Sequence, residues 1–155
     1  MEFRDFIEGL AERIGIAGGV RPDAEGVYRL GTNDVEVTFA EVPGIHRILI
    51  CGVVCPLPEE GAEALMRVML KENFLSGGTA AATFSLSETG QIVLCRQVDM
   101  DRTDGEGLYR TFELFLKMQL EWRNLVREYA PVALERIRTE RDGRREAEFF
   151  HADMV

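Results

Sequence analysis

The segment from Glu59 to Leu75, EEGAEALMRVMLKENFL, constrains the fold more than any other stretch of the chain. It has the length of a helix and lies between two segments with the pattern of strands. At about 100° per residue its apolar side chains cover an arc of roughly 200°, whereas a surface helix needs a stripe of little more than about 100°. One sheet cannot cover that arc, so we expect a second surface to pack against this helix. The arc consists of Ala62, Leu65, Met66, Val68, Met69 and Leu70.

Two arrangements would supply the second surface. The simplest is the same helix of another copy, related by a two-fold axis, which makes the protein a homodimer. The alternative is a central helix that is buried on several sides within one chain. In the first case the predicted dimer interface consists of Ala62, Leu65, Met66, Val68 and Met69.

Composition restricts the class of protein. With 155 residues, of which 46% are hydrophobic, the chain suits a single domain that buries about two-thirds of the surface of its unfolded form. The formal net charge is −9, and a nucleic acid or an anionic membrane requires a cationic surface. The N-terminal sequence MEFRDFIEGL is charged throughout, and no run of about 18 apolar residues is present. We therefore expect a cytoplasmic protein that binds neither nucleic acid nor membrane.

The cysteines do not predict a disulfide scaffold. Cys51, Cys55 and Cys95 are odd in number, and without an export signal we interpret them as buried thiols. Cys51 and Cys55 lie four residues apart in a strand-like run, which leaves a weak metal hypothesis with His46 or His151. Zinc sites usually have closer cysteine pairs in loops, so we predict no metal.

No catalytic group is evident. His46 begins an apolar strand and His151 lies in the C-terminal tail, where structural or exposed roles explain them. The glycine-rich pieces lack the Gly-Lys-Ser/Thr ending of a phosphate loop. Asp99, Asp101 and Asp104 fit solvated capping, with magnesium binding as a minor alternative. We predict no catalytic residue, no metal and no cofactor, and hence no enzyme.

The first half of the chain predicts a helix and three strands. Phe3 to Ile14 has the spacing of a one-faced amphipathic helix. Val27 to Leu30 and Val35 to Val42 form a hairpin with one dry face. Ile45 to Val54 is apolar on both faces, as in a central strand covered on both sides or one whose second face binds something.

The second half predicts a hairpin and a long helix. From Ala80 to Leu86, every second residue is apolar and the residues between are small or polar. Gln91 to Val98 gives the partner strand. A helix follows from about Thr103 to Tyr129. We expect one α+β domain over residues 1–130, with the order α-β-β-β-α-β-β-α and a twisted antiparallel sheet, and a charged tail over residues 131–155 that is partly helical or disordered. The core-facing series of the long helix is Leu108, Phe112, Phe115, Gln119, Trp122, Val126 and Tyr129.

This order, together with several local sequences, resembles the class I effector chaperones of bacterial type III secretion, the Tir chaperone family. The matching pieces are FIEGLAERIGI, GVYRLGTNDVEVTF, LICGVVCPLPEEGAEALMRVMLKENFL and FSLSETGQIVLCRQVDMD, followed by a long final helix that contains Trp122. Within them, Leu70 to Phe74 (LKENF) ends the central helix and Gly90 precedes a strand. The resemblance spans roughly residues 3 to 128 and rests on hydrophobic pattern and a few anchors.

The resemblance implies a non-enzymatic function. Members of this family are homodimers whose central helix lies at the two-fold interface. They hold the N-terminal chaperone-binding region of a secreted effector in extended form, without ATP, and keep it soluble and secretion-competent. The implied partners are a secreted effector and a second copy of the chain, with components of the secretion system as further candidates.

Apolar residues near the first helix and the first strands are the candidates for effector binding. An extended peptide can add a strand to a sheet edge and place alternate side chains in pockets. Burial in the core of the chain itself is the alternative explanation for each candidate. The candidates are Phe6, Leu10, Val35, Val37, Phe39, Ile48 and Ile50.

Two other functions remain open at this point. One is a regulatory or interaction protein of the same fold that binds a partner that is not exported. The other is a thiol-dependent enzyme that uses Cys51, Cys55 or Cys95, which predicts a low thiol pKa and rapid alkylation.

Overall fold

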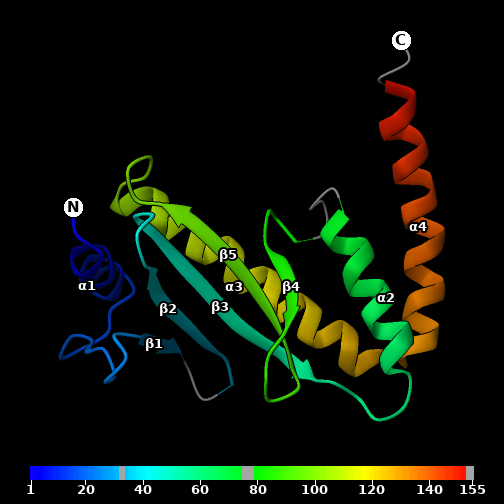
Figure 1. Cartoon of the computed structure of the whole chain (residues 1–155), viewed down its shortest axis with the longest axis horizontal. Coiled ribbons are helices and arrows are strands. Elements are labelled where there is room, and N and C mark those ends of the chain that lie inside the picture. The colour runs from blue at the N-terminus through cyan, green and yellow to red at the C-terminus, as the bar shows by residue number, and fades with distance from the viewer. Residues whose placement is uncertain (32–33, 75–78, 153–155) are drawn as a thin grey trace.

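The fold is a helix, a five-stranded sheet interrupted by a second helix, and two C-terminal helices (Figure 1). The computed structural model describes residues 1–31, 34–74 and 79–152, without the side chains of residues 142–146 and 149–152. The predicted α+β class and the element order up to the long helix are confirmed. The elements are α1 (Phe3–Arg13), β1 (Tyr28–Gly31), β2 (Glu36–Val42), β3 (Arg47–Pro56), α2 (Ala62–Asn73), β4 (Thr83–Leu86), β5 (Gln91–Asp99), α3 (Gly105–Glu128) and α4 (Pro131–Ala152).

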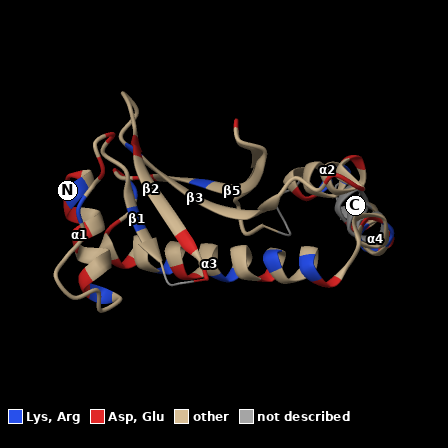
Figure 2. Cartoon of the chain, turned by 90° about the horizontal axis from the view of Figure 1, so that it is seen from below, with Lys and Arg blue, Asp and Glu red and all other residues tan. Residues whose placement is uncertain are grey.

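The sheet has the order β1-β2-β3-β5-β4, and each neighbouring pair is antiparallel. β3 is therefore the central strand, as its apolar sequence predicted. Figure 2 shows α3 running along one face of the sheet, while no described helix covers the other face. The second apolar face of β3 is thus left open by the described part of the chain. One buried row crosses four strands on the α3 side and consists of Val37, Gly52, Leu94 and Phe84.

Helix α3 meets the sheet at Gly52. The Gln119 side chain is fully buried, and its Nε2 donates hydrogen bonds to the backbone oxygens of Glu36, at 3.2 Å, and Val53, at 3.0 Å. A Cβ atom at Gly52 would collide with the Gln119 amide group. Because buried amides require hydrogen-bond partners, the missing side chain at Gly52 lets α3 bind β2 and β3 directly.

Replacement of Gly52 by Ala is expected to destabilise the protein by about 1–3 kcal/mol, because the displaced Gln119 amide loses its two carbonyl partners while still buried. Gly9→Ala is the matched control, since Gly9 lies in α1 and a Cβ there meets no atom within 4 Å. The control should be neutral or stabilising by up to about 1 kcal/mol. Urea unfolding of both variants measures the difference, and equal stabilities would contradict this role of Gly52.

Helix α4 lies alongside α2 (Figure 1), in the region where the sequence predicted a tail that is partly helical or disordered. Arg67 on α2 forms an ion pair with Glu135 on α4, with 2.8 Å between Nε and Oε1. Lys71 Nζ donates a hydrogen bond to Thr139 Oγ1 at 3.3 Å. Leu134, in the first turn of α4, is buried. The first half of α4 is thus packed on the body of the protein.

A buried charge pair joins α4 to the core. Glu72 on α2 is fully buried, and its Oε1 lies 3.7 Å from the Arg138 Nη1. The Arg138 guanidinium stacks on the Trp122 ring of α3, 4.6 Å from the ring centroid. One side chain of α4 therefore contacts both neighbouring helices, by charge on α2 and by a cation–π contact on α3.

Replacement of Arg138 by Ala should lower the free energy of unfolding by about 3 kcal/mol, because it removes a cation from beside a buried carboxylate. Arg136→Ala, at an exposed position of the same helix, is the control and should change stability by less than about 0.5 kcal/mol. Urea unfolding and limited proteolysis of α4 follow the effect. A stability of Arg138→Ala equal to that of the control would refute the proposed role of the pair.

Candidate functional site

An apolar groove of about 510 Å³ lies between the C-terminal end of α1, the strands β1 and β2, and α3. Helix α1 ends at Arg13 with Ile14 as its C-cap residue, and Gly15 then adopts a positive φ of 82°, which turns the chain out of the helix. This turn places Ile14 and Ile16 on the same wall of the groove. The groove is lined by Ile14, Ile16, Leu30, Gly31, Asp34, Val35, Val37, Tyr109, Phe112, Glu113, Leu116 and Leu120.

Strand β1 forms one side of this groove and is also an edge of the sheet. A Cβ atom at Gly31 would collide with the backbone oxygen of Val35, so glycine allows β1 and β2 to approach closely here. In the described part of the chain, β1 pairs on one side only, with β2. Its other edge offers backbone groups to an added strand beside an apolar groove.

Polar contacts fix the rim where α1 meets α3. The Arg13 guanidinium lies over the Tyr109 ring, 4.1 Å from its centroid, and forms an ion pair with Glu106. The hydrogen bond from Arg13 holds the pKa of Glu106 below its usual range. The Tyr109 hydroxyl donates to Glu113 Oε1 at 2.6 Å, and this bond raises the pKa of Tyr109. The rim is charged, whereas the floor of the groove is apolar.

The structure places the candidate effector-binding residues mainly in the core of the chain. All of them are buried, and only Val35 and Val37 line the groove. Burial in the chain's own core accounts for the remaining residues, because the apolar face of α1 and of each strand packs inward. The buried candidates are Phe6, Leu10, Val35, Val37, Phe39, Ile48 and Ile50.

Sequence reasoning missed the half-exposed residues of the groove. Leu116 and Leu120 lie four residues apart on α3, outside its core-facing series, and that spacing was the available signal. Ile14 and Ile16 flank Gly15, where the helix pattern stops. The neighbourhood was predicted from the first helix and first strands, but the individual side chains were not.

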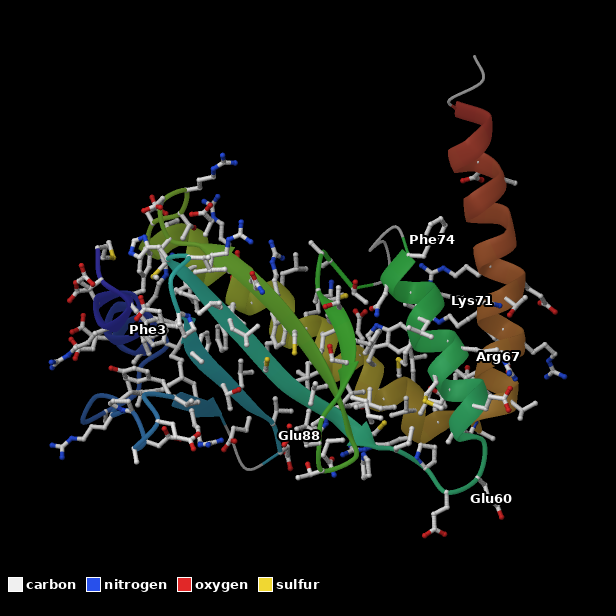
Figure 3. All side chains as sticks on the ribbon, in the orientation of Figure 1. Phe3, Glu60, Arg67, Lys71, Phe74 and Glu88 are labelled. Atoms are coloured by element: carbon white, nitrogen blue, oxygen red, sulfur yellow. The ribbon has the colours of Figure 1, made fainter. Side chains whose placement is uncertain are left out.

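The predicted dimer-interface residues divide into two groups. Leu65, Val68 and Met69 are buried within the chain, and Ala62 is half-buried. Met66 is exposed, as is the neighbouring Leu70. Helix α2 contacts β4 as well as α4, and Figure 3 shows Arg67 and Lys71 on the side of α2 that faces α4. Part of the wide apolar arc is therefore covered by the chain itself, as the second arrangement anticipated.

The uncovered part of the arc belongs to an apolar strip. Met66, Leu70, Phe74 and Leu86 are exposed, and a cavity of about 140 Å³ opens between α2 and β4 in the same place. The cavity walls are almost free of charge. They consist of Met66, Met69, Leu70, Asn73, Phe84, Ser85, Leu86 and Ile92.

The described residues contain no group of three or more His, Cys, Asp or Glu side chains that could hold a metal ion. His46 Nδ1 lies 2.8 Å from Asp101 Oδ1 in an exposed pair, and the side chain of His151 is outside the described residues. Burial raises the pKa of the Cys55 thiol.

None of the described helices is long and apolar enough to span a bilayer.

Solved structures with the same architecture include type III secretion chaperones and their complexes. The ExsC–ExsE complex matches with a TM-score of 0.63 and 22% identity, over 81% of this chain and 96% of that one. The HopA1–SchA chaperone–effector complex matches with a TM-score of 0.63 and 15% identity, over 79% and 93%. The Yersinia pestis type III secretion chaperone SycH, in complex with a stable fragment of YscM2, gives 0.60 and 13%, over 77% and 98%.

At these identities the structures define the fold, which is that of a type III secretion chaperone. The family model of the Tir chaperone protein (CesT) family matches residues 5–123, and the chain belongs to this family. The resemblance drawn from the sequence is thereby confirmed, and the family is one of effector-binding chaperones that are not enzymes. No curated protein sequence matches the chain. Helix α4 lies outside the matched residues.

Proposed function

We propose that this protein is a cytoplasmic, homodimeric type III secretion chaperone that holds the N-terminal segment of a secreted effector in extended form. The observation that carries the proposal is the apolar groove beside the edge strand β1. The HopA1–SchA complex, a chaperone–effector complex of the same fold, supports it. Binding of this kind keeps the effector segment soluble and competent for secretion.

An extended segment would pair with the outer edge of β1 through its backbone. Alternate side chains, about 7 Å apart along a strand, would then enter the groove. There they would contact Ile16, Leu116 and Leu120, the half-exposed groove residues. Burial of apolar surface supplies roughly 25 cal/mol per Å², so no ATP is needed to drive association. The net charge of −9 keeps the complex soluble.

Replacement of Leu120 by Glu should weaken effector binding tenfold or more, because a carboxylate would be desolvated in the apolar groove. Leu114→Glu is the matched control. Leu114 lies on the same helix and is 41% exposed, compared with 40% for Leu120, but of the two only Leu120 lines the groove. Co-expression with effector candidates encoded nearby, followed by titration of the isolated complex, gives the affinities. Equal affinities for the two variants would argue against this groove as the binding site.

The proposed dimer uses the apolar strip of Met66, Leu70, Phe74 and Leu86. These residues are exposed on one chain, and the cationic side chains of Arg67 and Lys71 are engaged by α4 on another side of α2. A second copy related by a two-fold axis would cover the strip with the same residues. The interface would then consist of the exposed part of the α2 arc, including Met66.

Replacement of Leu70 by Glu should convert the dimer to a monomer, because two carboxylates would face each other in an apolar interface. Val132→Glu is the control, since Val132 is 67% exposed and Leu70 is 69% exposed. Val132 follows Pro131, which adjoins Gly61 at the opposite end of α2 from Phe74. Sedimentation equilibrium measures the mass of each variant. A wild-type monomer at micromolar concentration, or a dimeric Leu70→Glu, would refute this interface.

A second candidate function is suggested by α4, which extends beyond the matched residues 5–123. A chain of this fold with an added helix could serve as a regulatory protein that binds a partner which is not exported, or a component of the secretion system. The location of the co-purified partner separates the two candidates. A partner that appears in the secreted fraction supports the effector chaperone, and one that stays in the cell supports the regulator.

A further inference from the structure

A row of small side chains crosses the face of the sheet opposite α3. Thr38, Cys51, Cys95 and Thr83 lie directly opposite one another on β2, β3, β5 and β4. Because side chains alternate along a strand and Gly52 faces α3, its neighbour Cys51 projects from the open face. Both cysteines are half-buried, so small reagents can reach them from solvent.

The two thiols in this row are adjacent. Cys51 Sγ and Cys95 Sγ are 2.9 Å apart. Residues directly opposite in antiparallel strands have Cα atoms about 4.5–5.5 Å apart, within the range of about 4.4–6.8 Å that a disulfide spans. The third cysteine, Cys55, pairs across the strands with Ile92 and has no thiol opposite it. The backbone thus presents one cysteine pair in position to form a bond.

We propose that Cys51 and Cys95 are a redox modification site, which hydrogen peroxide oxidises to a reversible cross-strand disulfide. In the first step the Cys95 thiolate attacks one oxygen of hydrogen peroxide, the O–O bond breaks, and a sulfenic acid forms as hydroxide leaves. The proton that the Cys95 thiol had released converts this hydroxide to water. In the second step the Cys51 sulfur attacks the sulfenic sulfur, the S–O bond breaks, and a second water leaves with the proton of Cys51. The two thiols lose two electrons, and one peroxide is reduced to two waters.

The surroundings assign the roles of the two sulfurs. The hydrogen bond between the two thiols lowers the pKa of Cys95 and raises that of Cys51. A hydrogen bond from the Ser85 side chain also lowers the pKa of Cys95. Since the thiolate is the nucleophile, Cys95 is the sulfur that peroxide oxidises first, and Cys51 is the resolving thiol. The pKa directions set which sulfur reacts first, whereas the 2.9 Å distance between the sulfurs is what makes the pair a site.

Reduction returns the sheet to its first state. A dithiol attacks one sulfur of the bond, forms a mixed disulfide and closes into its own disulfide, which leaves both cysteines as thiols. Disulfides in a reducing cell interior are usually transient and redox-sensing, and a solvent-accessible pair on an open sheet face fits that use. This inference does not rest on the proposed chaperone function, because it concerns the unliganded chain and the opposite face of the sheet from the groove.

The test uses the full-length protein without effector. The reduced protein is treated with hydrogen peroxide, and intact mass and free thiols are measured before and after addition of dithiothreitol. The wild type should lose 2 Da and two of its three thiols, and a peptide map should link Cys51 to Cys95. Cys55→Ser is the matched control and should lose the same 2 Da at the same rate. Cys51→Ser and Cys95→Ser should form no intramolecular disulfide.

Two further measurements distinguish the loss of a thiol from a folding defect. Far-UV circular dichroism shows whether each serine variant keeps the fold, and the wild type in concentrated urea shows the reaction without strand register. The bond should form at least tenfold more slowly in urea, because the sheet no longer holds the sulfurs together. Peroxide treatment of folded wild type that leaves its mass unchanged, links Cys55 instead, or yields only intermolecular bonds would overturn the proposal.

Discussion

The contact of Gln119 with Gly52 holds the two layers of this protein together. The amide of Gln119 donates to backbone oxygens of β2 and β3, and it reaches them because residue 52 has no side chain. A buried amide without partners costs about 1–3 kcal/mol. The observed position of α3 is therefore more stable than positions in which the helix is displaced along the sheet. The same helix provides Leu116 and Leu120 to the groove. The geometry of the groove therefore depends on a contact that lies outside it.

The side chains of helix α2 fall into three groups. Leu65, Val68 and Met69 are buried by the chain itself, Arg67 and Lys71 are bound by α4, and Met66 and Leu70 stay exposed. This division explains an apolar arc of roughly 200°, which is too wide for one sheet. It also leaves a narrower surface for a second copy than the whole arc suggested. Because α4 covers one side of α2 through charge pairs, the strip beside β4 is the surface of α2 that stays available for the proposed dimer.

The sequence was sufficient for the elements up to the long helix α3, but not for α4 or for the exposure of individual side chains. Hydrophobic period distinguishes α1 from β2 and identifies β3 as apolar on both faces, so class and order were predictable. The pairing of β5 with β3 joins strands that are far apart in the sequence, and a local hydrophobic pattern cannot predict which strands pair. Periodicity identifies an apolar face but not what covers it. For this reason Phe39 and Ile50 were candidates for binding although they are buried, while Ile16 and Leu120 were missed.

The two faces of the sheet separate the two proposed activities. Residues that alternate along β2 and β3 face α3 and the groove on one side and the thiol row on the other. A bond between Cys51 and Cys95 therefore changes no side chain that lines the groove. The bond affects the groove only through the spacing and twist of the strands. Strand β2 lies between Cys51 on β3 and the edge strand β1. Such coupling through an intervening strand is weaker than a direct contact, so an oxidised protein should retain the shape of its groove.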